Sequence, residues 1–194
     1  PYNHAEALEQ VFKEDGDQLA CVIVEPIAAN MGLVIPDPGF LQRLRDVTRR
    51  HGALLIFDEV VTGFRVTYGG AQTLFKITPD LTVLGKIIGG GFPIGAVGGS
   101  RPLMQQLAPE GPVYHAGTFA GHPIAMAAGL ATLEVLRQGS SYARLEQLGS
   151  RLAEGLRETA SRAHVPVQVS RFGSMLTLFF ASAPVRDFTE VQRT

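Results

Sequence analysis

The chain has 194 residues, of which 45% are hydrophobic and 18% charged, and its formal net charge is -1. This length provides one sizeable core, and the composition is typical of globular proteins. Because neither sign of charge clusters, we expect no nucleic-acid partner and no anionic membrane surface. No apolar run approaches the roughly 20 residues that span a bilayer, so we expect no membrane segment.

The single cysteine, Cys21, has no partner for an intramolecular disulfide. One lone thiol fits a reducing compartment, so we expect a cytoplasmic protein. Cys21 lies in an apolar run, and we interpret it as a small buried residue. Pro1 is not a natural start, and the sequence is therefore expected to be a fragment of a longer chain.

Helical and strand patterns alternate over the first two-thirds of the chain. The expected helices cover residues 5–12 and 40–50, and the expected strands cover residues 20–24, 53–57, 81–84 and 94–97. The first two strands are continuous apolar runs, the pattern of strands that are buried on both faces. Strands with intervening helices form parallel βαβ units. We therefore predict an α/β fold with a mostly parallel sheet flanked by helices.

Two long helices are predicted in the last third of the chain. The first covers residues 121–137 and is rich in alanine, whose small side chain lets a helix pack close to its neighbours. We expect Ser140 and Ser141 to end it. The second covers residues 142–163, with leucines at spacings of three and four residues and a charged opposite face.

Two strands, at residues 165–169 and 174–180, are expected after these helices. Long helices and paired strands thus replace the earlier alternation of strand and helix, which indicates a second domain. We expect residues 1–139 to be the C-terminal part of a large α/β domain. Residues 140–194 are expected to begin a small α+β C-terminal domain.

Three residues that can carry chemistry follow predicted strands: Glu25, Asp58 and Lys86. In open parallel sheets, ligands bind at the carboxyl ends of the strands. A single acid in such a position is more often a helix cap or a salt-bridge partner. Three such residues, on three strands, favour a binding site.

Lys86 has no charged neighbour in the sequence and is surrounded by apolar residues and glycines. If this segment is buried, the neutral amine is favoured, and a neutral amine is the nucleophile that forms a Schiff base with a carbonyl cofactor. The alternative is a lysine that extends its ammonium into a cleft or pairs with a carboxylate. The segment alone leaves both interpretations open. A lysine and a carboxylate together are used by pyridoxal phosphate enzymes, in which the carboxylate keeps the pyridine nitrogen protonated.

Two stretches resemble motifs of the class III aminotransferases, which are pyridoxal phosphate enzymes of fold type I. Residues 54–65, with the sequence LLIFDEVVTGFR, are similar to the aspartate motif of that family. Residues 79–86 and 89–96 are similar to its lysine motif. Within the family, the glutamate-1-semialdehyde 2,1-aminomutases are the closer match, and the stretches that resemble them are residues 24–31, 111–118, 124–129 and 173–180.

The resemblance implies a pyridoxal 5'-phosphate cofactor and a role for four residues around it. Lys86 would form the Schiff base and move protons, and Asp58 would pair with the pyridine nitrogen. Val60 would pack against the face of the ring. Asn30 would hydrogen-bond its phenolic oxygen. We expect these residues to bind the cofactor in the large domain.

Two further roles are implied. Thr118 would reach the phosphate of the cofactor that is bound mainly by a neighbouring subunit, which implies a homodimer with active sites at the interface. Glu25 would orient the site rather than transfer protons. The phosphate loop, the aromatic residue that stacks on the ring and the gating loop are expected to precede Pro1, and the small domain is expected to continue beyond Thr194.

The function that the resemblance implies is an aminomutase that converts the amino-aldehyde glutamate-1-semialdehyde to 5-aminolevulinate for tetrapyrrole (porphyrin) synthesis. Its cofactor would alternate with the pyridoxamine 5'-phosphate form. Two alternatives stay open at this point. One is a class III aminotransferase with a separate amino donor and acceptor, and the other is a truncated, cofactor-free fragment without activity. No metal is expected, because the five histidines lack the spacing of metal ligands.

Overall fold

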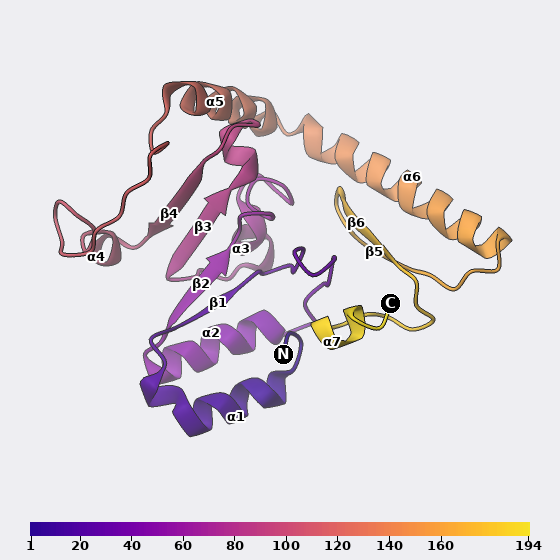
Figure 1. Ribbon diagram of the computed structural model, residues 1–194, viewed down its shortest axis with the longest axis horizontal. Coiled ribbons are helices and arrows are strands. Elements are labelled where there is room, and N and C mark those ends of the chain that lie inside the picture. The colour runs from indigo at the N-terminus through magenta and orange to yellow at the C-terminus, as the bar shows by residue number, and fades with distance from the viewer.

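The computed structural model describes residues 1–194, the whole of the sequence (Figure 1). Its elements in chain order are α1 (Ala5–Asp15), η1 (Gly16–Gln18), β1 (Cys21–Val24), α2 (Phe40–His51), β2 (Leu54–Asp58), α3 (Gly70–Phe75), β3 (Leu81–Gly85), η2 (Lys86–Gly89), β4 (Gly95–Gly99), α4 (Arg101–Met104), α5 (Pro123–Arg137), α6 (Ser140–Arg162), β5 (Gln168–Phe172), β6 (Met175–Phe179) and α7 (Phe188–Val191). None of the helices has both the length and the apolar character needed to cross a membrane.

The main sheet has four strands in the order β1-β2-β3-β4. The first three strands run parallel, and β4 runs antiparallel to β3. This confirms the predicted mostly parallel sheet flanked by helices. The direction of β4 departs from the βαβ pattern because the connection after β3 is shorter than the dozen or so residues that a parallel crossover needs.

The core lies between the main sheet and α2, beside which α1 packs (Figure 1). The helix presents its apolar side chains at the spacing of an amphipathic helix. The central buried cluster consists of Phe40, Leu41, Leu44, Leu55, Phe57 and Ile77. Val22 and Val24 of β1 pack against the same cluster.

The outer face of β1 differs from the prediction. Val22 and Val24 point toward the core, and side chains alternate along a strand, so Cys21 and Ile23 point to the opposite face. Ile23 is 61% exposed, and Cys21 is exposed as well. The prediction of a strand buried on both faces is therefore wrong for β1, and so is the prediction of a buried Cys21. An apolar run alone does not distinguish a central strand from an edge strand.

The boundary between α5 and α6 lies at Gln138 and Gly139, earlier than predicted. Gly139 has a φ of +79°, a left-handed conformation that glycine adopts without strain. Ser140 and Ser141 lie in the first turn of α6, so the prediction that they end the preceding helix is wrong. The first strand of the hairpin, β5, also begins three residues later than the predicted start at residue 165.

The β5–β6 hairpin packs against the loop that follows β1 as well as against α6. Met175 joins Ile27 and Leu33 in one cluster, and Phe179 packs in a second cluster over the same loop. The Leu33 N–H donates to Thr177 Oγ1 at 3.0 Å. The change from the main sheet to a separate two-stranded sheet agrees with a second structural unit, and the domain boundary at residue 140 stays a prediction.

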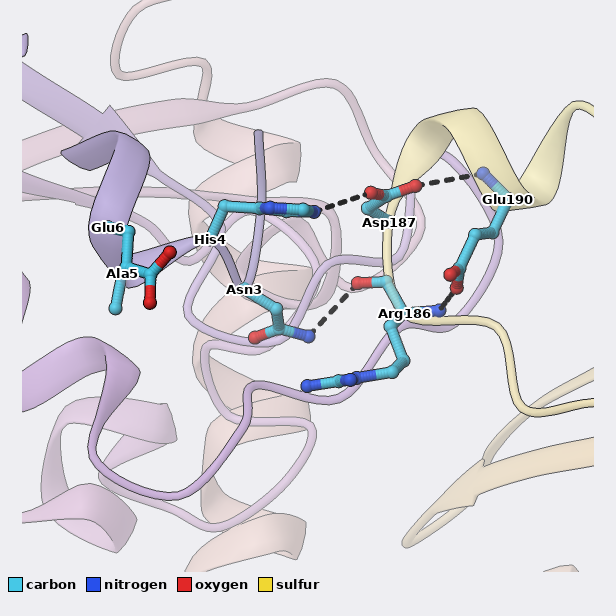
Figure 2. A pocket seen from close by; sticks show the side chains of 7 residues that line it. All are labelled: Asn3, His4, Ala5, Glu6, Arg186, Asp187 and Glu190. Carbon is cyan, nitrogen blue, oxygen red and sulfur yellow. Dashed lines mark hydrogen bonds and ion pairs between the residues drawn. The ribbon is translucent and has the colours of Figure 1, made fainter. Parts of the chain in front are cut away.

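A cluster of polar contacts joins the segment before α1 to the segment before α7 (Figure 2). His4 Nε2 lies 2.8 Å from Asp187 Oδ2, and Asn3 Nδ2 donates to the Arg186 carbonyl at 3.0 Å. Asp187 also caps α7, because its Oδ1 accepts from the Glu190 N–H at 2.8 Å. Residues far apart in the sequence are thereby held side by side.

The alanine-rich helix α5 packs directly on η2, the short turn that begins at Lys86 (Figure 1). A Cβ at Gly129 would lie 2.1 Å from the Ile88 carbonyl oxygen, and a Cβ at Gly90 would lie 2.4 Å from the Ala128 carbonyl oxygen. The two backbones therefore approach as closely as glycine allows. This packing fixes the chain that follows Lys86.

We predict opposite effects for two glycine-to-alanine substitutions in helices. Gly129→Ala places a methyl group against the η2 backbone and should lower the free energy of unfolding by about 1–3 kcal/mol. Gly155→Ala in α6 meets nothing within 4 Å. It should raise the free energy of unfolding by about 0.5–1 kcal/mol, because alanine is the better helix former. Urea unfolding of both variants measures this, and equal effects would contradict the close packing.

A second prediction concerns Asp187. The hydrogen bond from the Glu190 N–H, with a smaller contribution from His4, holds the pKa of the Asp187 carboxyl below its ordinary value. A lowered pKa stabilises the fold above the ordinary carboxyl pKa of about 4, and this stabilisation is lost as the pH falls through the lower folded-state value.

Asp187→Asn should therefore be less stable than the parent protein at neutral pH, and the difference should shrink near pH ~3. Thermal unfolding across this pH range measures it. A stability difference that does not change with pH would show that the charge of Asp187 contributes nothing.

Candidate active site

The carboxyl ends of β1, β2 and β3 meet at one edge of the main sheet. Val24 pairs with Phe57 across the first two strands, and Asp58 pairs with Val83 across the next two. Glu25, at the end of β1, therefore lies next along this edge to Asp58, at the end of β2. Lys86 is the residue directly after β3, the next strand of the sheet. Parallel pairing brings these three residues to the place where open sheets bind ligands.

Asp58 is the last residue of β2 and is half-buried. Its Oδ1 atom accepts a hydrogen bond from the Val60 N–H at 3.0 Å. No group of this chain donates a hydrogen bond to Oδ2. This oxygen is not among the buried polar atoms that lack a partner. One carboxylate oxygen is thus fixed by the backbone, and the other can accept a proton donor from a ligand.

Lys86 is the first residue of η2, and its side chain is exposed within this chain. It takes part in none of the ion pairs of the structure. The buried lysine that the sequence suggested is therefore not observed, and neither is pairing with a carboxylate. Its φ of +46° is left-handed, a conformation that strains a residue with a Cβ.

Val60 lies beside the backbone that leads into Lys86. The position that a Cβ would take on Gly85 is 3.3 Å from Val60 Cγ1. Glycine at this position therefore lets the half-buried valine contact the end of β3. Val60, Asp58 and Lys86 come from two adjacent strand ends, and they are the part of the predicted site that the sheet brings together.

Glu25 holds the loop that carries Asn30. Its Oε2 atom accepts from the Ala29 N–H at 2.8 Å and from the Asn30 N–H at 3.3 Å. The side chain of Asn30 is exposed. The hairpin covers the other side of this loop through the bond from Leu33 to Thr177. Whether Asn30 and Glu25 have the roles inferred from the family stays a prediction.

Thr118 lies elsewhere, in an exposed loop before α5. This loop lines an open groove of about 890 Å³ whose other wall comes from the start of β4, with residues Pro93–Ala96, His115–Gly121 and Met126 around it. Neither Lys86 nor Asp58 lines this groove. The structure therefore does not join Thr118 to the strand-end residues in one pocket.

Phe119 and Met126 line the groove and are exposed, and other exposed apolar side chains lie in the same part of the chain. Tyr114 is 83% exposed, Phe119 is 59% exposed and Leu130 of α5 is 65% exposed. Val113, Ile124 and Met126 belong to the same stretch of chain and are exposed as well. Large neighbouring apolar side chains on a surface indicate an interaction face.

The sequence interpretation missed Glu59. It follows Asp58 directly, and its carboxylate is fully buried and accepts hydrogen bonds from Thr62, Ala71 and Gln72. An acid next to a strand of apolar residues was visible in the sequence, but its partners lie 3 to 13 residues away, beyond the strand. No three His, Cys, Asp or Glu side chains converge anywhere as metal ligands would.

The left-handed conformation of Lys86 generates a prediction for a pair of variants. The free energy of unfolding of Lys86→Gly should be about 1 kcal/mol higher than that of Lys86→Ala, because only glycine adopts a positive φ without strain. Both variants should keep the fold, since the side chain is exposed. Urea unfolding without cofactor measures the difference, and a more stable alanine variant would refute the strain.

Curated relatives match almost the whole chain. It is 57% identical over 192 residues to a protein of Desulfosudis oleivorans named glutamate-1-semialdehyde 2,1-aminomutase, and the match covers 99% of this chain and 45% of that protein. A protein of Thermomicrobium roseum with the same name is 58% identical over 193 residues, which is 100% of this chain and 45% of the relative. The chain thus spans about half the length of the curated relatives it matches.

Solved structures have the same fold. An omega-transaminase from Sphaerobacter thermophilus superposes with a TM-score of 0.89 at 41% identity, covering 100% of this chain and 44% of that one. A glutamate-1-semialdehyde-aminomutase from Pseudomonas aeruginosa PAO1 superposes with a TM-score of 0.85 at 31% identity, covering 99% and 44%. A lysine-to-alanine variant of that aminomutase has also been solved in complex with PMP.

The family assignment rests on the sequence profile described as aminotransferase class-III, which matches residues 2–193. The match includes both strand-end motifs and continues through the β5–β6 hairpin. The chain belongs to the class III aminotransferase family.

Proposed function

We propose that the protein containing this chain is a pyridoxal phosphate-dependent aminomutase that converts glutamate-1-semialdehyde to 5-aminolevulinate. The observation that carries the proposal is the placement of Asp58 and Lys86 at the ends of two adjacent parallel strands. The proteins with this name that match the chain at 57–58% identity support the substrate. Tetrapyrrole synthesis is then the process that the product would serve.

The residues at the strand ends fit this cofactor. Pyridoxal phosphate, when bound, supplies an aldehyde that condenses with an amine and a pyridine ring that withdraws electrons from the reacting carbon. Asp58 has one carboxylate oxygen without a protein donor, and Lys86 has an exposed amine outside every ion pair. An acceptor and a nucleophile are therefore both available at one edge.

Asp58 would hold a proton on the pyridine nitrogen. The Val60 N–H fixes Oδ1 at 3.0 Å, so the carboxylate is oriented before the ring arrives. Val60 would lie against one face of the ring, because it already packs against the chain beside Lys86. Asn30 would donate to the phenolic oxygen, and Glu25 would keep the Asn30 loop in place through its two backbone hydrogen bonds.

Lys86 would move protons between substrate carbons through its Nζ atom. Its amine would take the proton from the carbon that loses the amino group and becomes the ketone carbon, and would deliver a proton to the former aldehyde carbon, which gains the amino group. Substrate and product are isomers, so the amino group moves between adjacent carbons and no external donor is consumed. The close packing of α5 on η2 holds the backbone of Lys86 during this transfer.

We also propose that two copies associate through the exposed apolar face around Thr118. Tyr114, Phe119 and Leu130 would be covered in the dimer, and Thr118 would then reach the phosphate at the partner's site. This arrangement gives a role to a residue that the single chain leaves apart from Asp58 and Lys86. A cytoplasmic location remains a prediction from the lone cysteine.

Two other functions remain as alternatives. Similarity to the omega-transaminase favours a class III aminotransferase with a separate amino donor and acceptor. The separation of Thr118 from the strand-end residues favours a fragment that binds no cofactor. The aminomutase is preferred because the curated proteins of that name match the chain at 57–58% identity and the omega-transaminase matches at 41%, whereas the solved aminomutase from Pseudomonas aeruginosa is a more distant relative at 31%.

Reductive trapping tests the cofactor assignment. Borohydride treatment of the full-length protein with pyridoxal phosphate, followed by peptide mapping, should place the label on Lys86. Lys86→Arg should abolish the label, and Lys76→Arg should keep it as a matched control in an exposed turn outside the strand ends. A label on another lysine, or no label on the parent protein, would refute the proposal.

An assay without an amino donor tests the reaction. The full-length protein should convert glutamate-1-semialdehyde to 5-aminolevulinate when neither a separate amino donor nor a keto-acid acceptor is present. A strict requirement for both would establish the aminotransferase alternative. Labelling of Lys86 without activity in either assay would refute both enzyme proposals but retain the cofactor.

A further inference from the structure

We propose that Glu59 is a positioning residue that fixes Asp58 relative to Lys86. The proposal rests on the function proposed above and extends it to a residue that does not itself reach the strand-end site. Glu59 follows Asp58 directly and is 0% exposed. Burying a carboxylate is costly unless its oxygens are fully hydrogen-bonded, so a buried acid beside a cofactor-binding acid requires an explanation.

The carboxylate of Glu59 is saturated with donors. Oε2 accepts from the Ala71 N–H at 2.6 Å and from Thr62 Oγ1 at 2.9 Å. Oε1 accepts from the Gln72 N–H at 3.0 Å and from Gln72 Nε2 at 3.2 Å. These four hydrogen bonds offset the loss of hydration. The carboxylate thereby ties the end of β2 to the start of α3.

The approach of α3 to this carboxylate depends on a glycine. A Cβ at Gly70 would lie 2.5 Å from Glu59 Oε2, and Gly70 has a φ of +70°. Only glycine combines this conformation with so close an approach. The sequence around α3 is therefore adapted to hold one carboxylate.

Glu59 is also bonded to β3, the strand that leads to Lys86. Its N–H donates to the Val83 carbonyl at 2.9 Å, one residue beyond the last paired position of β2. Gln72 Nε2, which donates to Glu59, also donates to Thr82 Oγ1 at 3.3 Å. Glu59 is therefore hydrogen-bonded to β3, the strand that ends directly before Lys86.

The hydrogen bonds of Glu59 are important because the side chain of Asp58 makes few itself. Its side chain receives one hydrogen bond, from the Val60 N–H. Neighbouring residues of an extended chain point to opposite faces, so an inward Glu59 directs Asp58 outward to the strand-end site. Loosening Glu59 would let the Asp58 carboxylate turn away from the position of the pyridine nitrogen.

The test uses Glu59→Gln in the full-length protein loaded with pyridoxal phosphate. The amide has the shape of the carboxylate, but its NH₂ group must face N–H donors that cannot reverse. We expect the midpoint of the pH titration of the cofactor's visible absorption to shift by about one pH unit. We also expect about tenfold weaker cofactor binding, by analogy with residues that hydrogen-bond to metal-binding side chains and orient them. Neither measurement depends on an activity assay.

Two further variants keep the test decisive if Glu59→Gln fails to fold. Thr62→Val removes one donor to the carboxylate without changing its size, and should shift the titration in the same direction. Thr62→Ser retains the hydroxyl and should restore the parent titration. A Thr62→Val variant with the parent titration and parent affinity would overturn the proposal.

Asp80→Asn is the matched structural control. Asp80 Oδ2 accepts from the Leu55 N–H at 2.7 Å and from Arg45 Nη1 at 2.8 Å. This acid therefore joins β3 to β2 at the amino ends of the strands, far from the carboxyl ends where Asp58 and Lys86 lie. The variant should lower thermal stability and leave the cofactor titration unchanged. If Glu59→Gln behaves like Asp80→Asn, Glu59 is merely structural. If the parent protein itself shows no cofactor band, the proposed function fails, and the role of Glu59 fails with it.

Discussion

Parallel pairing of β2 with β3 is the constraint on which the rest of the site depends. The pairing of Asp58 with Val83 sets how far each strand extends, and therefore places a carboxylate and an amine at one edge of the sheet. A shift by one residue would turn Asp58 to the core face and Glu59 outward. Backbone hydrogen bonds hold the register at both ends: the Asp80 N–H donates to the Leu55 carbonyl where the strands begin, and the Glu59 N–H donates to the Val83 carbonyl where they end.

The surroundings of the strand ends come from three separate parts of the chain. Helix α5 holds the turn after Lys86 through contacts that only glycine permits, and Glu25 holds the Asn30 loop. The β5–β6 hairpin covers that loop from the other side. Motion of the hairpin would thus be transmitted to Asn30, whereas Asp58 and Lys86 depend on the sheet and on α5. The candidate site therefore combines two residues whose backbone is fixed by the sheet and by α5 with a loop supported by another unit.

Most of the sheet and the identity of the strand-end residues could be predicted from the sequence, because a buried parallel strand is an apolar run and polar residues after it are conspicuous. Three features could not. The exposed face of β1 depends on which strands are neighbours, and the direction of β4 depends on a connection too short for a crossover. Two partners of Glu59, Ala71 and Gln72, lie in a short helix that no apolar periodicity indicated. Lys86 is exposed within this chain, so its assignment rests on the motifs around it and not on burial.

The central claim is that Asp58 and Lys86 hold opposite parts of one cofactor ring. The most direct measurement is the ¹⁵N NMR shift of pyridoxal phosphate labelled at the pyridine nitrogen and bound to the full-length protein. A protonated nitrogen in the parent protein and an unprotonated nitrogen in Asp58→Asn is the predicted result. The same shift in both proteins would show that Asp58 does not face the ring and would contradict the arrangement derived from the sheet.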